Sequence, residues 1–517
     1  MSEAQNRGLV TEFIRNYRGR SLLHCYGGLK ARLIRLFLVL AFVLFGVFTD
    51  LFGLGGITEN FTYRAYSLLV APFHDTAERD NVPVVMIDDR DLRSHDWIWP
   101  VSYQNHARVL DEILKYRPRS IYMDFLFIDQ REDPTIGRLV PVLEKYIEAE
   151  IPVYLPVLPF KRQRAEIRDL TRTVLATRAQ QGLNDEEYIL RKVTRASRSN
   201  EGASKEDYEK RGFERTFPAF ALYLHGCSRG DCGKSELKPS ADDLRFESPL
   251  QIQWGIVPSA KNDFLKGCNY SAKQSVWDVS KKLLSTVMFE SVAKAEEQCP
   301  YMPVISVTNL LHEGFSPSAS AYVAKELSDR IAGKDVVYGQ ALVGVSDFVD
   351  PPTQPRVSSG YRHAMALENL RRDGDNYLKS KISISVPFLS EDAARSVTVT
   401  PETVFLVALV LLSTIHAFAS FSTESFLQKD DRKLGRHLIV SLAAHGFYLS
   451  ILLLLTIVQV WLFRLAPLNL LGLFGLIATV RGVSGSFYFE ALERGLSRLL
   501  QLLTSVLRNQ SIRGESI

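Results

Sequence analysis

Four long apolar stretches constrain the fold of this chain more than any other feature. Two of them are 36–54 and 403–421, and a longer apolar run is divided by an arginine and a proline into 438–460 and 465–482. A bilayer core about 30 Å thick is crossed by about 20 helical residues, so each stretch is long enough to span it. The sequence therefore predicts one transmembrane helix, a large polar domain over 55–400, and three further transmembrane helices.

Basic residues predict the orientation of these helices. The N-terminal segment, 1–35, carries seven arginines and lysines against two glutamates, and the connection 422–437 carries four basic residues. Positive charge marks cytoplasmic segments, so both termini and this connection are expected in the cytoplasm. The domain over 55–400 then lies outside, and the turn near Arg464 faces the same side as that domain.

A cleaved signal peptide is the alternative interpretation of the first stretch. That stretch is long and begins far from the N-terminus, and Gly53-Leu54-Gly55-Gly56 is a poor cleavage site. A membrane anchor is therefore preferred.

Cysteine placement agrees with the predicted orientation. Of five cysteines, only Cys25 lies on the inner side, and Cys227, Cys232, Cys268 and Cys299 lie in the outer domain, where disulfides persist. The expected pairs are Cys227–Cys232 and Cys268–Cys299, although four cysteines allow three connectivities and free buried thiols are also possible. A metal site is disfavoured because no pair has the spacing of two intervening residues.

The formal net charge of +4 is small for 517 residues, and the outer domain has no concentrated basic stripe. Nucleic acid is therefore not an expected partner.

Strand and helix patterns alternate at the start of the outer domain. In order along the chain, the predicted strand, helix, strand, helix and strand are 84–87, 107–114, 121–123, 135–148 and 152–157. This alternation predicts right-handed crossovers and an α/β fold with a largely parallel, Rossmann-like sheet.

Two aspartates follow the first two predicted strands. Asp88 and Asp124 come directly after 84–87 and 121–123. Ligands gather at the carboxyl ends of parallel strands, so both are candidates for a binding site. Aspartates at strand ends also cap the following helix or turn, and we weight that structural role equally.

The next segments are less regular. Residues 161–211 carry thirteen basic and nine acidic residues and few apolar ones, which predicts a charged surface insertion, either solvated or a protein-docking arm. Residues 237–300 show no assignable pattern. A buried strand is predicted again over 334–339, and a helix after Gly360 places His363 on its inward face, as a ligand-binding or a structural residue.

Two separated motifs resemble those of the type 2 CHASE domain, an extracellular sensory module of bacterial cyclases and histidine kinases. The matching residues of the first motif are Ile87-Asp88-Asp89, Trp99-Pro100 through His106-Ala107, and Asp124-Phe125-Leu126-Phe127. Those of the second are Gly333-Lys334 through Gly339, Asp347, Pro351-Pro352 and Gly360 through Ala364. Two departures occur: Val101-Ser102-Tyr103 replaces a segment that often holds arginine, and His363 follows Gly360 by three residues rather than four.

The resemblance covers about 60–385, and it implies a sensory domain in the bacterial inner membrane. The candidate ligand-binding residues are Asp88, Asp89, Trp99, His106, Asp124, Asp347 and His363. Carboxylates can accept from hydroxyl or amine groups or hold a cation, and an indole can stack on a ligand. Each residue also has a fold-bracing alternative, which we favour for His106. No cofactor and no resident metal are expected.

Relatives of this kind commonly continue into a catalytic output domain, whereas only a short tail, 483–517, follows the last predicted helix. Its leucines share one face of a predicted amphipathic helix, which would lie on the membrane, pair with a second copy or dock a partner. A cytoplasmic effector acting in trans is therefore expected.

Three functions are compatible with these observations. The first is a sensor of a small envelope ligand or partner protein, and the second is a structural subunit of an envelope complex that docks through 161–211. An enzyme built on Asp88, Asp124 and Asp347 is disfavoured because no catalytic motif is present. Small residues in the third and fourth predicted helices permit self-association, although packing within one molecule is the preferred explanation.

Overall fold

The computed structural model describes most of the outer domain. The described residues are 63–127 except 69, 132–158, 163–176, 186–191, 216–233, 239–259 except 258, 300–312, 316–344, 348–353, 356–380, 382–385, 396–399 and part of 450–466. Four predicted segments, 1–35, 36–54, 403–421 and 483–517, lie outside them, as do most of 438–460 and 465–482. Cys25, Cys268, Cys299 and Asp347 also lie outside the described residues.

The chain divides into two compact units. One contains Tyr63–Val399 together with Val458–Pro467, and it holds the α/β domain. The other contains Met1–Thr62, Thr400–Ile457 and Leu468–Ile517. Among the described residues, no helix is both long and apolar enough to cross a bilayer.

Six described strands form one parallel sheet in the order β4-β3-β2-β8-β1-β7. Their bounds are β1 Val84–Asp88, β2 Ser120–Met123, β3 Val153–Val157, β4 Arg172–Leu175, β7 Val304–Ser306 and β8 Asp335–Ala341. The chain moves from β1 to β2, β3 and β4 on one side and later adds β7 on the other. Strand β8 enters between β1 and β2, so the strand order reverses there. Parallel α/β sheets place their ligand sites at such reversals.

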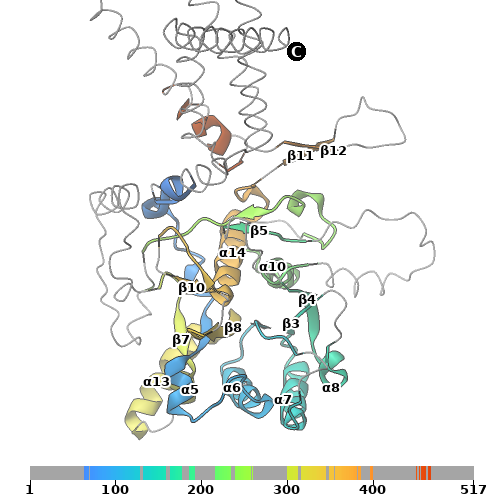
Figure 1. The fold of residues 1–517 in the computed structure, drawn as a ribbon, viewed down its shortest axis with the longest axis vertical. Helices are drawn as coiled ribbons and strands as arrows, with labels where there is room; N and C mark the ends of the chain where they lie inside the picture. Colours follow the sequence, from blue (N-terminus) through green and yellow to red (C-terminus); the bar gives the residue numbers. More distant parts are fainter. Residues whose placement is uncertain are drawn as a thin grey trace, which may run out of the picture. The chain divides into compact units, whose positions relative to one another are not determined.

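Alternating side chains of each strand enter two separate cores. In β1, Val84 and Met86 join one core, and Val85 and Ile87 join the other. The first core also contains α10 (Pro218–Ser228) and α14 (Ser359–Asp373). The second contains α6 (Tyr103–Lys115), α7 (Ile136–Glu148), α12 (Val307–Leu311) and α13 (Pro317–Ile331). The sheet is thus the middle layer between two helical layers, with α6 and α7 across it from α10 and α14 (Figure 1).

Local signals explain where several helices begin. The hydroxyl of Ser102 accepts the amide N–H of Asn105 at the start of α6, and Ser316 accepts that of Ala319 at the start of α13, which also has Pro317 in its first turn. Such side chains satisfy amide groups that have no partner within the helix. Two short α-helices, α5 (Asp89–Ser94) and α8 (Ala165–Arg168), also lie before β4.

Three small two-stranded pairings lie outside the main sheet. They are β5 (Glu187–Tyr188) with β6 (Leu250–Gln251), β9 (Phe348–Val349) with β10 (Val357–Ser358), and β11 (Ile382–Ser385) with β12 (Ser396–Val399). All three are antiparallel.

The α/β prediction and its largely parallel sheet are confirmed. The predicted strands over 84–87, 121–123, 152–157 and 334–339 correspond to β1, β2, β3 and β8. The helices predicted over 107–114 and 135–148 correspond to α6 and α7.

Two local expectations differ from the structure. The segment 161–211 was expected to be a surface insertion throughout, but β4 is an edge strand of the main sheet and Tyr188 is fully buried. Residues 177–185 and 192–211 lie outside the described residues. Helix α14 was expected to bury one face, whereas Gly360 through Arg372 are all buried. Its polar residues are buried because side chains from distant segments pair with them, as described below.

Candidate functional site

Asp124 lies at the carboxyl end of β2, beside the strand-order reversal. Its amide N–H donates to the carbonyl of Tyr338 on β8 at 2.7 Å, which fixes the backbone. Its carboxylate accepts the Tyr122 hydroxyl on Oδ1 at 2.8 Å and the Ser359 hydroxyl on Oδ2 at 2.7 Å. Strand β2 and the first turn of α14 thus converge on one carboxylate.

Two glycines bring α14 close to β8 at this point. A Cβ added to Gly360 would lie 3.7 Å from both Asp124 Oδ2 and the Cα of Gly339. These are ordinary van der Waals distances, so the space beside the carboxylate would hold about one methyl group. The Asp124 side chain keeps 13 % of its surface exposed, so a ligand larger than a methyl group needs a local opening to contact the carboxylate fully.

His363 lies one turn into α14 and is fully buried. Its Nε2 is 3.7 Å from Asp124 Oδ1, and its Nδ1 is 2.7 Å from the hydroxyl of Tyr188. The Tyr188 oxygen also accepts the amide N–H of Ala219 at 3.1 Å, so its own proton can be donated to Nδ1. That arrangement leaves the imidazole proton on Nε2, which faces Asp124.

The environment favours a neutral carboxyl at Asp124. Burial raises the pKa of Asp124 above its ordinary value, while hydrogen bonds from Ser359 and Tyr122 act in the opposite direction. Desolvation disfavours the charged form of a carboxyl, so the proton is held to a higher pH than in water. Burial also raises the pKa of the Tyr188 phenol.

We call Tyr122, Asp124, Tyr188, Ser359 and His363 the Asp124 cluster.

The order of groups in this cluster differs from that of a hydrolytic triad. Ser359 donates to the carboxylate of Asp124, whereas a nucleophilic serine would donate to the imidazole. The cluster is better suited to proton binding than to nucleophilic attack, because burial and the bonds from Ser359 and Tyr122 act on the pKa of Asp124 in opposite directions. In the part of the chain that the structure describes, no group of three or more His, Cys, Asp or Glu side chains is placed to hold a metal ion.

Of the seven candidate residues, the structure brings Asp124 and His363 together. Asp88 lies at the end of β1. Strand β8 lies between β1 and β2, so these two strands are two spacings, or about 10 Å, apart. Its carboxylate accepts the amides of Arg90 and Asp91, and Asp91 bonds back to the Asp88 amide. Asp88 is therefore the capping residue of α5, the structural role given equal weight above.

Asp89, Trp99 and His106 occupy other surroundings. Asp89 accepts the amide N–H of Val343 at 3.1 Å, and no hydrogen bond among the described residues joins Trp99 (36 % exposed) to Asp124. The His106 Nδ1 is 3.1 Å from the Tyr338 hydroxyl, and its ring packs edge-on against Phe125. His106 is thus buried against the second core and bonded to a tyrosine hydroxyl, in agreement with the structural role favoured for it.

Sequence reasoning missed three members of the Asp124 cluster. Tyr122 is two residues before Asp124 on the same strand, and Ser359 directly precedes Gly360, so strand alternation and the helix start were available signals. Tyr188 carried no such signal, because it lies in the charged range 161–211.

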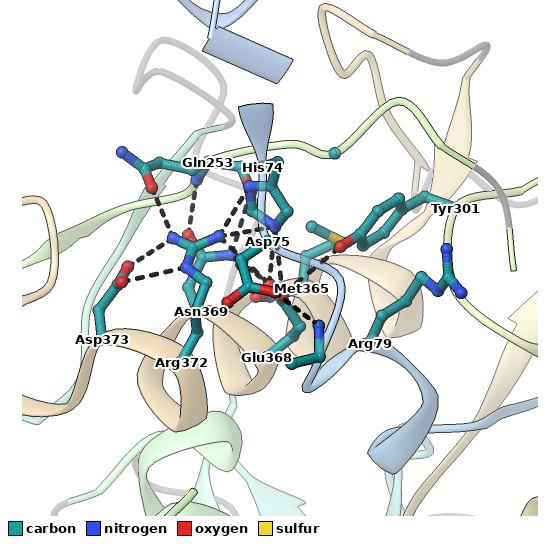
Figure 2. Close-up of polar contacts among 12 residues, drawn as sticks. His74, Asp75, Arg79, Gln253, Tyr301, Met365, Glu368, Asn369, Arg372 and Asp373 are labelled. Carbon is teal, nitrogen blue, oxygen red and sulfur yellow. Dashed lines mark hydrogen bonds and ion pairs between the residues drawn. The ribbon is translucent and has the colours of Figure 1, made fainter. Parts of the chain in front are cut away.

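A second buried polar network, which sequence reasoning also missed, lies at the other end of α14 (Figure 2). Glu368 is 3.1 Å from His74 Nε2 and 3.9 Å from Arg372 Nη1. Arg372 also pairs with Asp373 and donates to Gln253 Oε1 at 2.5 Å. Burial raises the pKa of Glu368, but the charges of His74 and Arg372 outweigh it and the pKa is lowered.

A third network surrounds the disulfide. Cys227 and Cys232 are bonded, as the sequence predicted, and the loop between them carries Asp231. The Asp231 carboxylate pairs with Arg119 and with Arg371 at 2.9 Å. Both guanidinium groups are buried, and the disulfide therefore holds their counter-charge in place. The predicted Cys268–Cys299 bond lies outside the described residues.

The sequence profile of the CHASE2 domain matches residues 38–412, which is more than half of the chain. No curated protein and no solved structure matches the chain significantly. The motifs around Asp88, Trp99, Asp124 and Gly360 fall within the matched range. The chain belongs to the CHASE2 domain family, a family of sensory domains.

Proposed function

We propose that this chain is a multi-pass protein of the bacterial inner membrane that senses an extracytoplasmic small ligand or envelope protein. Its N- and C-termini would lie in the cytoplasm and its α/β domain in the periplasm or outside the cell. It would pass the signal to a separate cytoplasmic effector. Membership of the CHASE2 family carries this proposal.

Two structural observations support the membrane topology. The helical residues Leu453, Leu454, Ile457 and Trp461 expose large apolar side chains, and they belong to or directly follow the predicted helix 438–460. The turn after that helix pairs with the outer domain, since the Lys379 amide donates to the Arg464 carbonyl at 2.7 Å. This bond agrees with a turn on the same side of the membrane as the domain.

The Asp124 cluster is the proposed recognition site. It lies at the strand-order reversal and contains a buried carboxyl, an imidazole and three hydroxyl groups. A ligand with hydroxyl or amine groups would replace the Ser359 and Tyr122 bonds to Asp124. Such a ligand shifts a conformational equilibrium only by its difference in affinity for the two states.

Ligand-dependent stabilisation tests the recognition site. The full chain in lipid nanodiscs would be unfolded by heat with and without fractions of small molecules extracted from the periplasm. A binding fraction should raise the midpoint of thermal unfolding for wild type and for Asp111→Asn, a surface control, but not for Asp124→Asn. An equal rise of the thermal midpoint in Asp124→Asn would place the ligand elsewhere. If no fraction raises the midpoint, the sensor proposal is left without a ligand.

Affinity capture tests the effector. The tagged chain would be solubilised gently from its native membrane, and its partners identified by mass spectrometry. Co-purification of a cytoplasmic kinase, cyclase or regulator would support the sensory function. Recovery of envelope-assembly proteins instead would favour a structural subunit.

A further inference from the structure

Four short backbone segments, distant in sequence, form one hydrogen-bonded ladder. Tyr188 of β5 pairs with Leu250 of β6, and the Gln251 amide donates to the Leu378 carbonyl at 2.7 Å. Lys379 in turn pairs with Leu250 on one side and Leu465 on the other. We call 186–188, 250–252, 378–380 and 464–466 the four-segment ladder.

The outermost segment, 464–466, contains the predicted turn residue Arg464 and the first two residues of the predicted helix 465–482, which the structure shows in a β-bridge and not in a helix. The Ala466 amide donates to the Lys379 carbonyl at 2.8 Å, and the Lys379 amide donates to the Arg464 carbonyl at 2.7 Å. Gln459 donates from Nε2 to the Ala466 carbonyl at 2.6 Å, and Leu465 is only 2 % exposed. This segment is therefore joined to the α/β domain by an isolated β-bridge and its flanking hydrogen bonds.

The other predicted transmembrane helices are connected to the same ladder. Tyr63 follows the first predicted helix, 36–54, in the chain. It is buried, and its hydroxyl donates to the Ile252 carbonyl. Residues 378–380 precede the second predicted helix, 403–421, in the chain. The ladder thus contains or bonds chain segments that come after the first predicted helix, before the second, and where the third and fourth meet.

The innermost segment reaches the Asp124 cluster. The Tyr188 hydroxyl bonds to His363 Nδ1 at 2.7 Å, and Arg362 donates to the Glu187 carbonyl. Ser380 donates its hydroxyl to Glu187 Oε1 at 3.1 Å, which ties the third segment to the first. From Asp124 to Leu465 the connection runs through His363, then Tyr188, Leu250 and Lys379.

We propose that the four-segment ladder couples the Asp124 cluster to the segment 464–466, where the third and fourth predicted transmembrane helices meet in the chain. This inference rests on the proposed sensory function. Paired strands move together because sliding one past another breaks their hydrogen bonds, and buried backbone groups are strongly disfavoured without partners. A shift of His363 therefore moves Tyr188 and the segments paired with it.

Amide hydrogen exchange of the full chain in nanodiscs tests the coupling without a ligand. Tyr188→Phe removes the hydroxyl that joins His363 to the ladder. Exchange in peptides covering 464–466 should become about five- to tenfold faster, the factor expected for one lost hydrogen bond. The matched control is Tyr146→Phe, which loses a buried bond to the Leu110 carbonyl (2.7 Å) in the other core and should leave 464–466 unchanged. Equal exchange at 464–466 in Tyr188→Phe and wild type would overturn the coupling.

A second variant perturbs the ladder from its outer end. Ala466→Pro removes the amide that donates to Lys379 and keeps the Lys379–Arg464 bond. Coupling is reciprocal, so exchange in peptides covering 186–188 and 250–252 should become several-fold faster. No change in those peptides would contradict the proposal, even where Tyr188→Phe fails to fold.

These outcomes separate the inference from the proposed function. Coupled exchange with no stabilising ligand would support the ladder and count against the sensor. Stabilisation that is lost in Asp124→Asn, without coupled exchange, would support the sensor and overturn the ladder.

Discussion

The imidazole Nδ1 of His363 lies 2.7 Å from the hydroxyl of Tyr188, although 175 positions separate the two residues. Tyr188 belongs to a two-residue strand in a charged stretch, and His363 belongs to the helix at the centre of the first core. This contact, with the bond from Arg362 to the Glu187 carbonyl, joins α14 to β5 and so to the four-segment ladder. A change of protonation at Asp124 therefore has a direct structural route to the edge of the domain.

The folding stability of the outer domain should depend on pH through Asp124. The pKa of its carboxyl is raised above the ordinary 3.8, so between 3.8 and the raised value the folded state holds a proton that the unfolded chain has released. The free energy of unfolding should then fall as pH rises through that window, by about 1.4 kcal/mol per unit of pKa difference. Chemical unfolding of the chain in detergent, at a series of pH values, measures this fall.

Asp124→Asn should lack that fall, because an amide does not titrate. Asp111→Asn is the matched control, since Asp111 pairs at the surface with Lys145 and has no contact with the Asp124 cluster. A fall of the same size in Asp124→Asn and wild type would show that another group is responsible.

Neutralising Glu368 should destabilise the domain strongly. Glu368→Gln leaves His74 and Arg372 buried with one counter-charge fewer, and breaking a buried pair costs about 3 kcal/mol or more. Asp111→Asn, which removes an exposed pair with Lys145, should change the free energy of unfolding by about 0.5 kcal/mol. Urea unfolding of both variants measures the difference, and equal effects would contradict the arrangement in Figure 2.

Removal of the disulfide should have a moderate effect. Cys227 and Cys232 are separated by five positions, and closing so short a loop contributes about 2 kcal/mol to stability. The Cys227→Ser, Cys232→Ser double variant should lose about that amount, with a further loss from Asp231 if its carboxylate leaves Arg119 and Arg371. The measurement is urea unfolding, together with mass spectrometry of unreduced peptides, in which an absent 227–232 link would refute the bond.

Labelling with a membrane-impermeant maleimide checks the predicted topology. Val343 is exposed on the outer domain, so Val343→Cys should react in intact spheroplasts. Arg432→Cys, in the connection predicted to be cytoplasmic, should react only after the membrane is opened. Both variants would be made in a Cys25→Ser background, and labelling of Arg432→Cys in intact spheroplasts would reverse the orientation.

The main sheet could be predicted from the sequence because its strands are continuous apolar runs. Residues 84–87 and 121–123 are apolar throughout and are followed by helical spacing, so local pattern and tertiary position agree. Strand β4 has no such run: Arg172 and Thr173 are partly exposed at the sheet edge, and only Val174 is fully buried. Edge strands bury one face or less, and their pattern cannot be told from that of a loop.

The polar part of the site could be predicted only in fragments. Asp124 and His363 were identified because a motif and a strand end marked them, whereas Tyr188 had no local signal. Glu368, Arg371 and Arg372 follow one another on α14 with the pattern of a solvated surface. They are buried because His74, Glu78 and Asp231 supply opposite charges from elsewhere in the chain. Pairing of this kind depends on tertiary structure and leaves no periodicity in the sequence.

Helix α14 is buried along its whole length and held by polar contacts at both ends, His363 at the first and Arg372 at the last. An apolar helix in an apolar core can rotate or slide at small cost, but this one cannot turn without separating buried charges. Its 15 residues span about 22 Å, so it behaves as a rigid rod across the domain. The His363 contacts and the His74 segment are therefore positioned by one and the same element, at its two ends.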